Sequence, residues 1–151
     1  MSLRREIEQK RPFASLEEEV YLNLQRTSER LERRLAEGLR PHGLSPTQYN
    51  ALRILRGAGA EGLPCGEVGE RMVTHDSDVT RLLDRLAKLG LVERSRSERD
   101  RRVVVARATP KALRLLAQLD EPVEAMVRES MSRLSPARLE ALNRDLERLR
   151  R

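Results

Sequence analysis

Basic side chains share one face of a helix that the apolar spacing predicts over residues 76–89. Its apolar face carries Val79, Leu82, Leu83, Leu86 and Leu89. Its polar face carries Ser77, Arg81, Arg85 and Lys88. Arginine and lysine bind phosphate oxygens, and both also donate to the O6 and N7 acceptors of guanine. The spacing therefore indicates a helix that binds a polyanion through one face and packs through the other.

A second basic cluster lies between two short segments rich in β-forming residues, at 91–94 and 102–106. The residues between them are highly charged, which predicts a two-stranded hairpin with a polar tip. Arg99, Arg101 and Arg102 lie at this tip and are suited to the narrow minor groove of A-tracts, where the potential is most negative. The alternative is a solvated turn without a ligand.

The order of these elements predicts a winged helix-turn-helix, because a short helix over residues 65–72 directly precedes the basic one and a hairpin follows it. Gly69 is small where the two helices must cross closely. The N-terminal residues of the second helix then meet base edges in the major groove, which makes Ser77, Asp78, Thr80 and Arg81 candidate base contacts. Arg85 and Lys88, further along the helix, are candidate phosphate contacts.

Two acidic residues, Asp76 and Asp78, stand at the start of this basic helix. Three roles are open to them: to stabilise the helix N-terminal dipole, to accept from cytosine N4, or to form a ligand-responsive pair. The dipole interaction contributes roughly 0.3–1 kcal/mol and is the simplest of the three.

Helices are also predicted on both sides of this segment. Apolar residues at helical spacing predict a long helix over 16–40 with a stripe formed by Val20, Leu24, Leu31, Leu35 and Leu39. Ser45, Pro46 and Gln48 form a capping signal for a helix to about residue 56, with Tyr49, Leu52 and Leu55 facing inward, and the glycine-rich residues 57–62 form a loop. A helix begins at Thr109-Pro110, with a bend near Asp120 caused by Pro122, and a last one begins at Ser135-Pro136.

Composition narrows the class of partner. The 151 residues suffice for one domain with a helical extension, and 30 Lys and Arg against 24 Asp and Glu favour a polyanionic partner. Most of the basic residues are Arg, which suits bidentate contacts but also accompanies a genome rich in G and C. With one Phe, two Tyr and no Trp, a base-stacking platform for single strands is disfavoured, and duplex DNA is the expected ligand.

Other function classes lack their residues. The chain has no glycine-rich phosphate cradle, nucleophile elbow or His-Glu zinc motif, so we expect no enzyme and no cofactor. Cys65 is the only cysteine, and His42 and His75 are too few for a metal site, so no metal is expected. No apolar stretch approaches the ~20 residues of a membrane span, and no signal peptide is present, so we expect a soluble cytoplasmic protein.

The segment VTRLLDRLAKLGLVERSRSERDRRVVVARATPKA resembles the core of the multiple antibiotic resistance regulators, the MarR family, and the likeness extends over roughly residues 44–116. Its most specific part is Asp100-Arg101-Arg102, since wings of this family carry an Asp that orients and an Arg that inserts into the minor groove. The resemblance assigns orientation to Asp100 and insertion to Arg101 or Arg102. Where the family has Leu-Thr followed three residues later by Gly, this chain has Ala108-Thr109 and then Ala112.

The resemblance also implies a homodimer in which the first helix and the last two helices of each subunit interlock. The implied dimerisation residues are Val20, Leu24, Leu139, Leu142, Leu146 and Leu149. The expected fold is therefore mainly α with a small β-hairpin wing, a winged helix-turn-helix with N- and C-terminal dimerisation helices. Its expected parts are a dimerisation helix at 1–40, a DNA-binding lobe at 41–108 and dimerisation helices at 109–151.

The function implied is that of a sequence-specific transcriptional regulator, a ligand-responsive repressor that binds a pseudo-palindromic operator as a dimer. Members of the family often bind a small anionic or phenolic effector between the dimerisation helices and the DNA-binding lobe. Arg26, His42 and Tyr49 are the candidate ligand contacts, although Tyr49 equally suits a core position. The alternatives are a nonspecific architectural DNA-binding protein and a regulator without small-molecule control.

Overall fold

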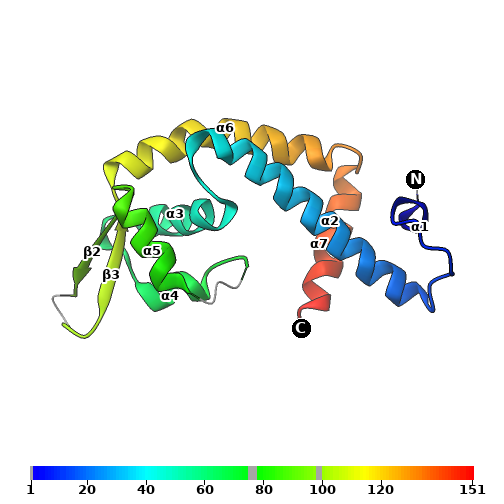
Figure 1. Cartoon of the computed structure of the whole chain (residues 1–151), viewed down its shortest axis with the longest axis horizontal. Coiled ribbons are helices and arrows are strands. Elements are labelled where there is room, and N and C mark those ends of the chain that lie inside the picture. The colour runs from blue at the N-terminus through cyan, green and yellow to red at the C-terminus, as the bar shows by residue number, and fades with distance from the viewer. Residues whose placement is uncertain (1, 75–77, 98–99) are drawn as a thin grey trace.

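The chain folds into a small lobe of short helices and a β-sheet, from which longer helices extend (Figure 1). The computed structural model describes residues 2–74, 78–97 and 100–151. The first long helix, α2, spans Leu16–Leu39 as predicted. Ser15 caps it by accepting a hydrogen bond from the Glu18 N–H at 3.2 Å. A short helix, α1 (Leu3–Glu6), precedes it and was not predicted; the Glu6 carboxylate pairs with Arg26 of α2 at 3.3 Å.

The capping signal at Ser45 produces the expected helix, α3 (Pro46–Ala58). Ser45 Oγ accepts from the Gln48 N–H at 3.1 Å, and the Gln48 side chain accepts from the Ser45 N–H at 3.0 Å, so both orphan donors are satisfied. Single 3₁₀ turns flank the helix at Arg40–His42 (η1) and Gly59–Glu61 (η2). The helix therefore runs two residues past the predicted end, and part of the predicted loop is helical.

Two short helices follow, α4 (Cys65–Glu70) and α5 (Val79–Lys88). Both are shorter than predicted, and α5 starts at Val79 because Asp78 occupies the capping position. Gly69 has the expected role: a Cβ there would lie 2.8 Å from Cγ2 of Val79, so only glycine permits this approach of α4 to α5. His75, Asp76 and Ser77 lie outside the described residues.

The predicted two-stranded hairpin is present, and a third short strand joins it to form a three-stranded antiparallel sheet. Its strands are β1 (Leu63–Pro64), β2 (Val92–Arg96) and β3 (Val104–Ala108), in the order β1-β3-β2. Two residues are too few to show a strand pattern, which explains why β1 was missed. Gly62 precedes β1 with a φ of +69°, and a Cβ at this position would lie 2.4 Å from the carbonyl oxygen of Ala106.

The last two helices, α6 (Pro110–Met131) and α7 (Pro136–Leu149), begin at the predicted Ser/Thr-Pro signals. Pro122 does not interrupt α6, which Figure 1 shows as one arched helix over the lobe. Pro122 removes one backbone donor, and it lies on the exposed side of α6, while Leu119 and Val123 pack against the core on either side of it. Their packing holds the two halves of the helix together.

The hydrophobic core lies in the lobe. Its largest fully buried side chains are Leu39, Leu52, Leu55, Val68, Leu83, Leu86, Leu116 and Leu119. The predicted inward positions Tyr49, Leu52 and Leu55 are all buried, whereas Leu89 is half exposed because it follows the last residue of α5. Within the described residues, no helix is both long and apolar enough to cross a membrane.

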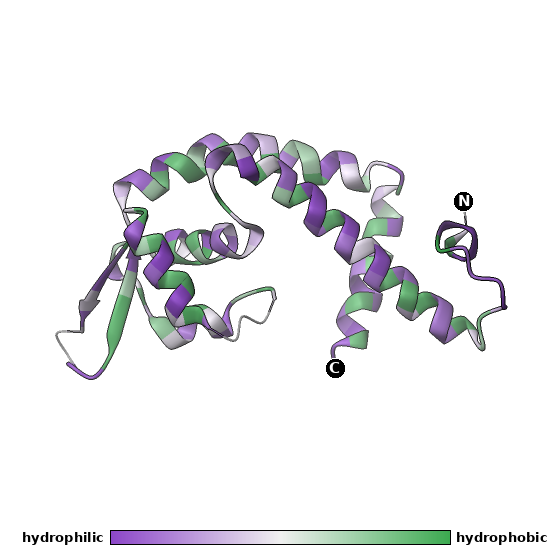
Figure 2. Cartoon of the chain, viewed as in Figure 1, coloured by the Kyte–Doolittle hydropathy of each residue, from purple (hydrophilic) through white to green (hydrophobic). Residues whose placement is uncertain are grey.

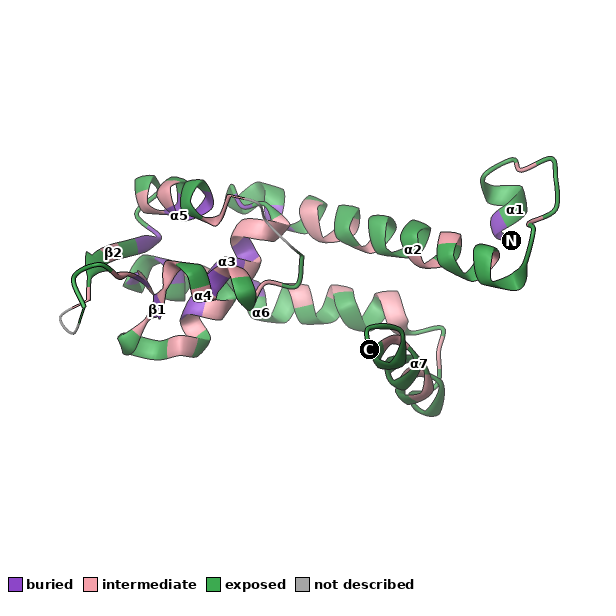
Figure 3. Cartoon of the chain, turned by 90° about the horizontal axis from the view of Figure 1, so that it is seen from below, coloured by how far each residue is buried: buried purple, intermediate pink, exposed green. Residues whose placement is uncertain are grey.

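The helices that extend from the lobe, α2, α6 and α7, are its arms, and they bury few residues of their own. Leu39 is the buried residue of α2, and α7 has none among its fourteen residues. Apolar residues recur along these arms (green in Figure 2), and most of α2 and α7 is coloured as exposed in Figure 3. The exposed apolar residues include Val20 and Tyr21 of α2 and Leu142 and Leu149 of α7. The lobe is thus packed around its own core, while the arms present apolar surface that this chain alone does not cover.

Candidate nucleic-acid interface

Helix α5 has two chemically distinct faces. Leu82, Leu83 and Leu86 are buried in the lobe core. The exposed side chains of α5 include Thr80, Arg81, Arg85 and Lys88. The predicted cationic face is therefore on the surface of the protein. Ser77, the remaining residue predicted for this face, lies outside the described residues.

Asp78 caps α5. One carboxylate oxygen accepts from the Arg81 N–H at 3.0 Å, and the other lies 3.0 Å from Nε of Arg81. This geometry satisfies an orphan donor of the first turn and places a negative charge at the positive end of the helix. It matches the dipole role considered for Asp78 in the sequence, and the ion pair leaves the Arg81 guanidinium solvent-exposed.

The tip of the wing is shaped by Asp100. Its carboxylate accepts from the backbone N–H of Arg102 at 2.9 Å, and its carbonyl accepts from the Val103 N–H at 2.9 Å. The Ser97 N–H in turn donates to the carbonyl of Val103 at 2.9 Å and continues the pairing of β2 with β3. Asp100 thus orients the backbone that carries Arg101 and Arg102, both of which are exposed. Arg99 lies outside the described residues.

The arginines of the wing fall into two groups. Arg107 is directed back onto the fold, with Nε donating to the Ala60 carbonyl at 3.0 Å and Nη1 to Ser95 Oγ at 2.7 Å. By contrast, no ion pair among the described residues includes Arg96, Arg101 or Arg102, and all three are exposed. Arg96 was not singled out in the sequence. The available signal for it was the alternation of Arg with Ser in the short charged segment that ends β2.

Arg94 was also missed. Its side chain extends from β2 to the cationic helix α5, where Nη1 donates to the carboxylate of Asp84. The opposite charges, ten residues apart on the two elements predicted to form the site, were the signal for this pair. It joins the cationic helix to the wing.

This arrangement of a cationic helix beside a wing with exposed arginines can now be set against known proteins. The MarR family profile matches residues 42–103, which include α3, α4, α5 and strands β1 and β2. A solved MarR transcription factor from Planctomyces limnophilus is 38% identical, covering 90% of this chain and 98% of its own, with a TM-score of 0.69. The chain belongs to the MarR family. This is a family of winged helix-turn-helix transcriptional regulators and not of enzymes.

Two further relatives define the extent of the likeness. The uncharacterized HTH-type transcriptional regulator YfiV of Bacillus subtilis is 36% identical over 108 residues, which are 72% of this chain and 66% of YfiV. BpsR of Bordetella bronchiseptica, whose DNA binding is regulated by 6-hydroxynicotinic acid, is 22% identical. Its structure covers 92% of this chain and 97% of its own with a TM-score of 0.80, which shows a shared fold.

This MarR-family chain has a cavity of about 310 Å³ between the arms and the lobe. Its apolar wall consists of Leu31, Leu35, Pro46, Val73, Met126, Val127 and Met131. Its polar lining comprises Ser28, Glu32, Tyr49, Asn50, Arg53, Thr74 and Ser130. Of the three residues predicted to contact a ligand, Tyr49 lines the cavity, whereas Arg26 pairs with Glu6 and His42 is exposed in η1.

Arg53 is the cation of this cavity, and it was not predicted. Its guanidinium carbon lies 5.8 Å from the centre of the Tyr49 ring, within the range of a cation–π contact. Burial raises the pKa of the Tyr49 phenol, and the positive charge of Arg53 acts in the opposite direction. The described lining of the cavity therefore combines an apolar wall with the arginine Arg53, the carboxylate Glu32 and the neutral phenol of Tyr49.

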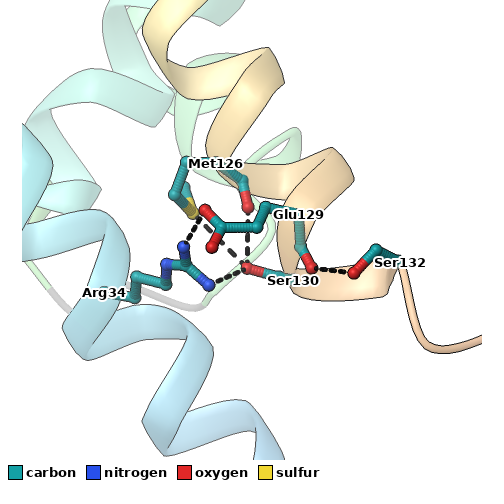
Figure 4. Close-up of polar contacts among 5 residues, drawn as sticks. All are labelled: Arg34, Met126, Glu129, Ser130 and Ser132. Carbon is teal, nitrogen blue, oxygen red and sulfur yellow. Dashed lines mark hydrogen bonds and ion pairs between the residues drawn. The ribbon is translucent and has the colours of Figure 1, made fainter.

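Polar contacts between α2 and α6 lie next to this cavity (Figure 4). Arg34 of α2 donates to Ser130 Oγ at 3.2 Å and forms an ion pair with Glu129. Ser130 Oγ donates in turn to the carbonyl of Met126 at 2.7 Å. Since Met126 and Ser130 also line the cavity, these contacts fix one of its walls relative to α2.

The residues predicted for dimerisation all lie on the arms. They are Val20 and Leu24 on α2, and Leu139, Leu142, Leu146 and Leu149 on α7. Each is exposed or only partly buried in the single chain, and Leu149 is 68% exposed. The leucines of α7 are therefore at most partly covered by the described part of the chain.

Proposed function

We propose that this protein is a sequence-specific duplex-DNA-binding regulator. The observation that carries the proposal is the cationic face of α5, whose apolar side is buried in the core and whose basic side is exposed next to the wing arginines. The major groove of B-DNA is wide enough to admit an α-helix such as α5. A substrate site would require polar groups that converge on an enclosed space, whereas the basic side chains of α5 and the wing are exposed on the surface.

The proposed contacts follow from position. Thr80 and Arg81 are proposed to meet base edges, since they lie in the first turn of α5. Asp78, which caps the helix, and Ser77, which lies outside the described residues, are proposed as further base contacts. Arg85 and Lys88 contact phosphates. Arg101 or Arg102, with Arg99 beside them, enters the minor groove, and Asp100 holds the turn that presents them.

The protein is proposed to act as a homodimer in the cytoplasm. The exposed apolar residues of α2 and α7 support an interface between two copies, because such a surface is unfavourable in water. A twofold axis places two recognition helices about 34 Å apart, so the operator is a pseudo-palindrome with half-sites one DNA turn apart.

The proposed functional parts are residues 1–40 and 109–151 for dimerisation and residues 41–108 for DNA binding. Leu39 and Leu116 of the arms lie in the lobe core, so these parts form one folding unit.

A small anionic or phenolic effector is proposed to bind the cavity and to release DNA, so that the protein is a ligand-responsive repressor. Arg53 supplies the positive charge for a carboxylate, and the methionines and leucines suit an aromatic ring. Regulation of BpsR by 6-hydroxynicotinic acid gives a suitable probe. In fluorescence anisotropy, millimolar 6-hydroxynicotinate should weaken operator binding by the wild type but not by Arg53→Gln, and equal responses of the two proteins would remove Arg53 from the proposal.

The DNA-binding proposal is tested by fluorescence anisotropy across a salt series. The probes are a duplex from upstream of the coding region of the protein and a scrambled duplex of the same composition. A preference of ~10³ or more for the native duplex supports an operator-binding regulator. Equal and steeply salt-dependent binding of both duplexes supports the alternative, a nonspecific architectural protein.

A further inference from the structure

Among the described residues, one ion pair joins the side chains of the cationic helix to those of the wing. Arg94 of β2 donates from Nη1 to Oδ1 of Asp84 on α5. Asp84 follows Arg81 by three positions and precedes Lys88 by four, so it lies beside the residues proposed to contact DNA. Arg94 is paired across the sheet with Ala106 of β3, in the middle of the strand.

Arg94 is directed inward, unlike the exposed Arg96, Arg101 and Arg102. Its side chain is 24% exposed, and its Nε is buried without a hydrogen-bond partner among the described residues. Leaving a buried donor unsatisfied is unfavourable, so the ion pair must offset part of that cost. Arg96, on the same strand, is exposed, and it forms no ion pair with another described residue. Arg94 therefore holds a structural position, whereas Arg96 is available to a ligand.

The charge of Asp84 also indicates a structural role for the Asp84–Arg94 pair. A carboxylate beside Arg81 and Lys88 repels the phosphates that these residues would attract. Pairing with Arg94 neutralises this carboxylate and connects it to the strand that leads to the wing tip. One contact thus removes an unfavourable charge and links two separate DNA-binding elements.

We infer that Asp84 and Arg94 are positioning residues that fix the angle between α5 and the wing, so that one duplex is contacted in both grooves at once. The inference rests on the proposed DNA-binding function. Angular control matters because a strand rises about 3.3 Å per residue, so a rotation of about 15° at Arg94 moves a residue three positions further along by roughly 2.6 Å. Such a displacement removes a minor-groove hydrogen bond and leaves phosphate attraction largely intact.

The test compares variants on the duplex that wild-type protein enriches from a random pool and on its scrambled counterpart. Arg94→Gln and Asp84→Asn should each weaken binding to the enriched duplex about tenfold. Neither should weaken binding to the scrambled duplex by more than about twofold. The double variant should lose no more than either single variant, because both changes remove the same contact. Arg94→Lys, which keeps the charge but not the planar fork, should lose less than Arg94→Gln.

The salt dependence separates positioning from direct contact. A lost phosphate contact lowers the slope of log K against log salt by about 0.9, so Arg94→Gln should leave the slope unchanged. The matched control is Arg128→Gln, which breaks an exposed Arg–Glu pair on α6 and should leave DNA binding as in the wild type. Thermal melting and sedimentation of every variant establish that it is folded, and Asp84→Asn with Arg94→Lys suffice if Arg94→Gln does not fold.

Three results would overturn the inference: a slope reduced by about one in Arg94→Gln, losses that add in the double variant, or an unchanged preference for the enriched duplex. If the wild type enriches no duplex, the proposed DNA-binding function fails and the inference fails with it. If the wild type enriches a duplex and the variants behave like it, only the inference fails.

Discussion

Arg56 of α3 and Asp120 of α6 meet through two parallel hydrogen bonds, Nη1 to Oδ2 at 2.8 Å and Nη2 to Oδ1 at 2.9 Å. The pair joins the DNA-binding lobe to an arm by a fork that only arginine provides. The hydrogen bond from Arg56 lowers the pKa of Asp120, and the same bond raises the pKa of Arg56.

Asp120→Asn should lower the free energy of unfolding by about 0.5 kcal/mol at pH 7, because a partly exposed ion pair contributes little. The pKa of Asp120 is lowered in the folded state, so its stabilisation is present above the unfolded value and is lost as pH falls through the folded value. The difference from wild type should therefore persist at pH 5 and shrink only below pH 3.8, the ordinary pKa. Urea titrations from pH 3 to 7 measure this, with Glu124→Gln as control. A difference that shrinks already at pH 5–6 would contradict the assignment to Asp120.

Gly69→Ala should destabilise the lobe by roughly 1–3 kcal/mol, the typical result of inserting a methyl group into a packed contact. The new Cβ would lie 2.8 Å from Cγ2 of Val79, the first residue of α5. Gly66→Ala in the same helix is the matched control, because its Cβ would meet no atom within 4 Å. Urea denaturation compares the two variants, and equal stabilities would show that α5 shifts without cost.

Much of this fold could be predicted from the spacing of its apolar residues and from its capping residues. Ser45 and Thr109 cap helices at the expected positions, and the helix predicted from residue 16 by its apolar spacing begins at Leu16. Strand β1 and helix α1 could not be predicted, since two to four residues carry no periodicity and are fixed by tertiary contacts.

The site was predictable where side chains are exposed and less so where they are paired. Helical spacing alone placed Arg85 and Lys88 on the surface. Tyr49 and Arg53 lie four residues apart in α3, so helical spacing was an available signal that they share one face of the helix. Spacing could not reveal that Arg94 turns inward to Asp84, because that contact joins separate elements. Such pairings depend on tertiary geometry that one sequence does not contain.

Arg101→Ala or Arg102→Ala should weaken binding to the native duplex by about 1–3 kcal/mol, the usual contribution of a groove contact. Both side chains are exposed at the wing, so their removal leaves the core and the dimer unaffected. Arg114→Ala, an exposed arginine of α6 outside the proposed interface, is the control for loss of charge. Anisotropy and sedimentation measure affinity and assembly. Unchanged affinity in both wing variants would exclude the wing from the mechanism.

Replacing Leu142 and Leu146 together with Asp should convert the dimer to a monomer. Both residues lie in the leucine seam of α7, which buries no residue within its own chain, and a carboxylate at either position would have to be desolvated in the interface. Because α7 contributes no residue to the hydrophobic core, the variant should keep the helical content of the wild type. Arg144→Asp with Arg148→Asp introduces the same side chains on the opposite face of α7 and should remain dimeric. Sedimentation velocity reports both outcomes: a leucine variant that sediments as a dimer would place the interface elsewhere, and a monomer that still prefers its operator would show that one lobe suffices for recognition.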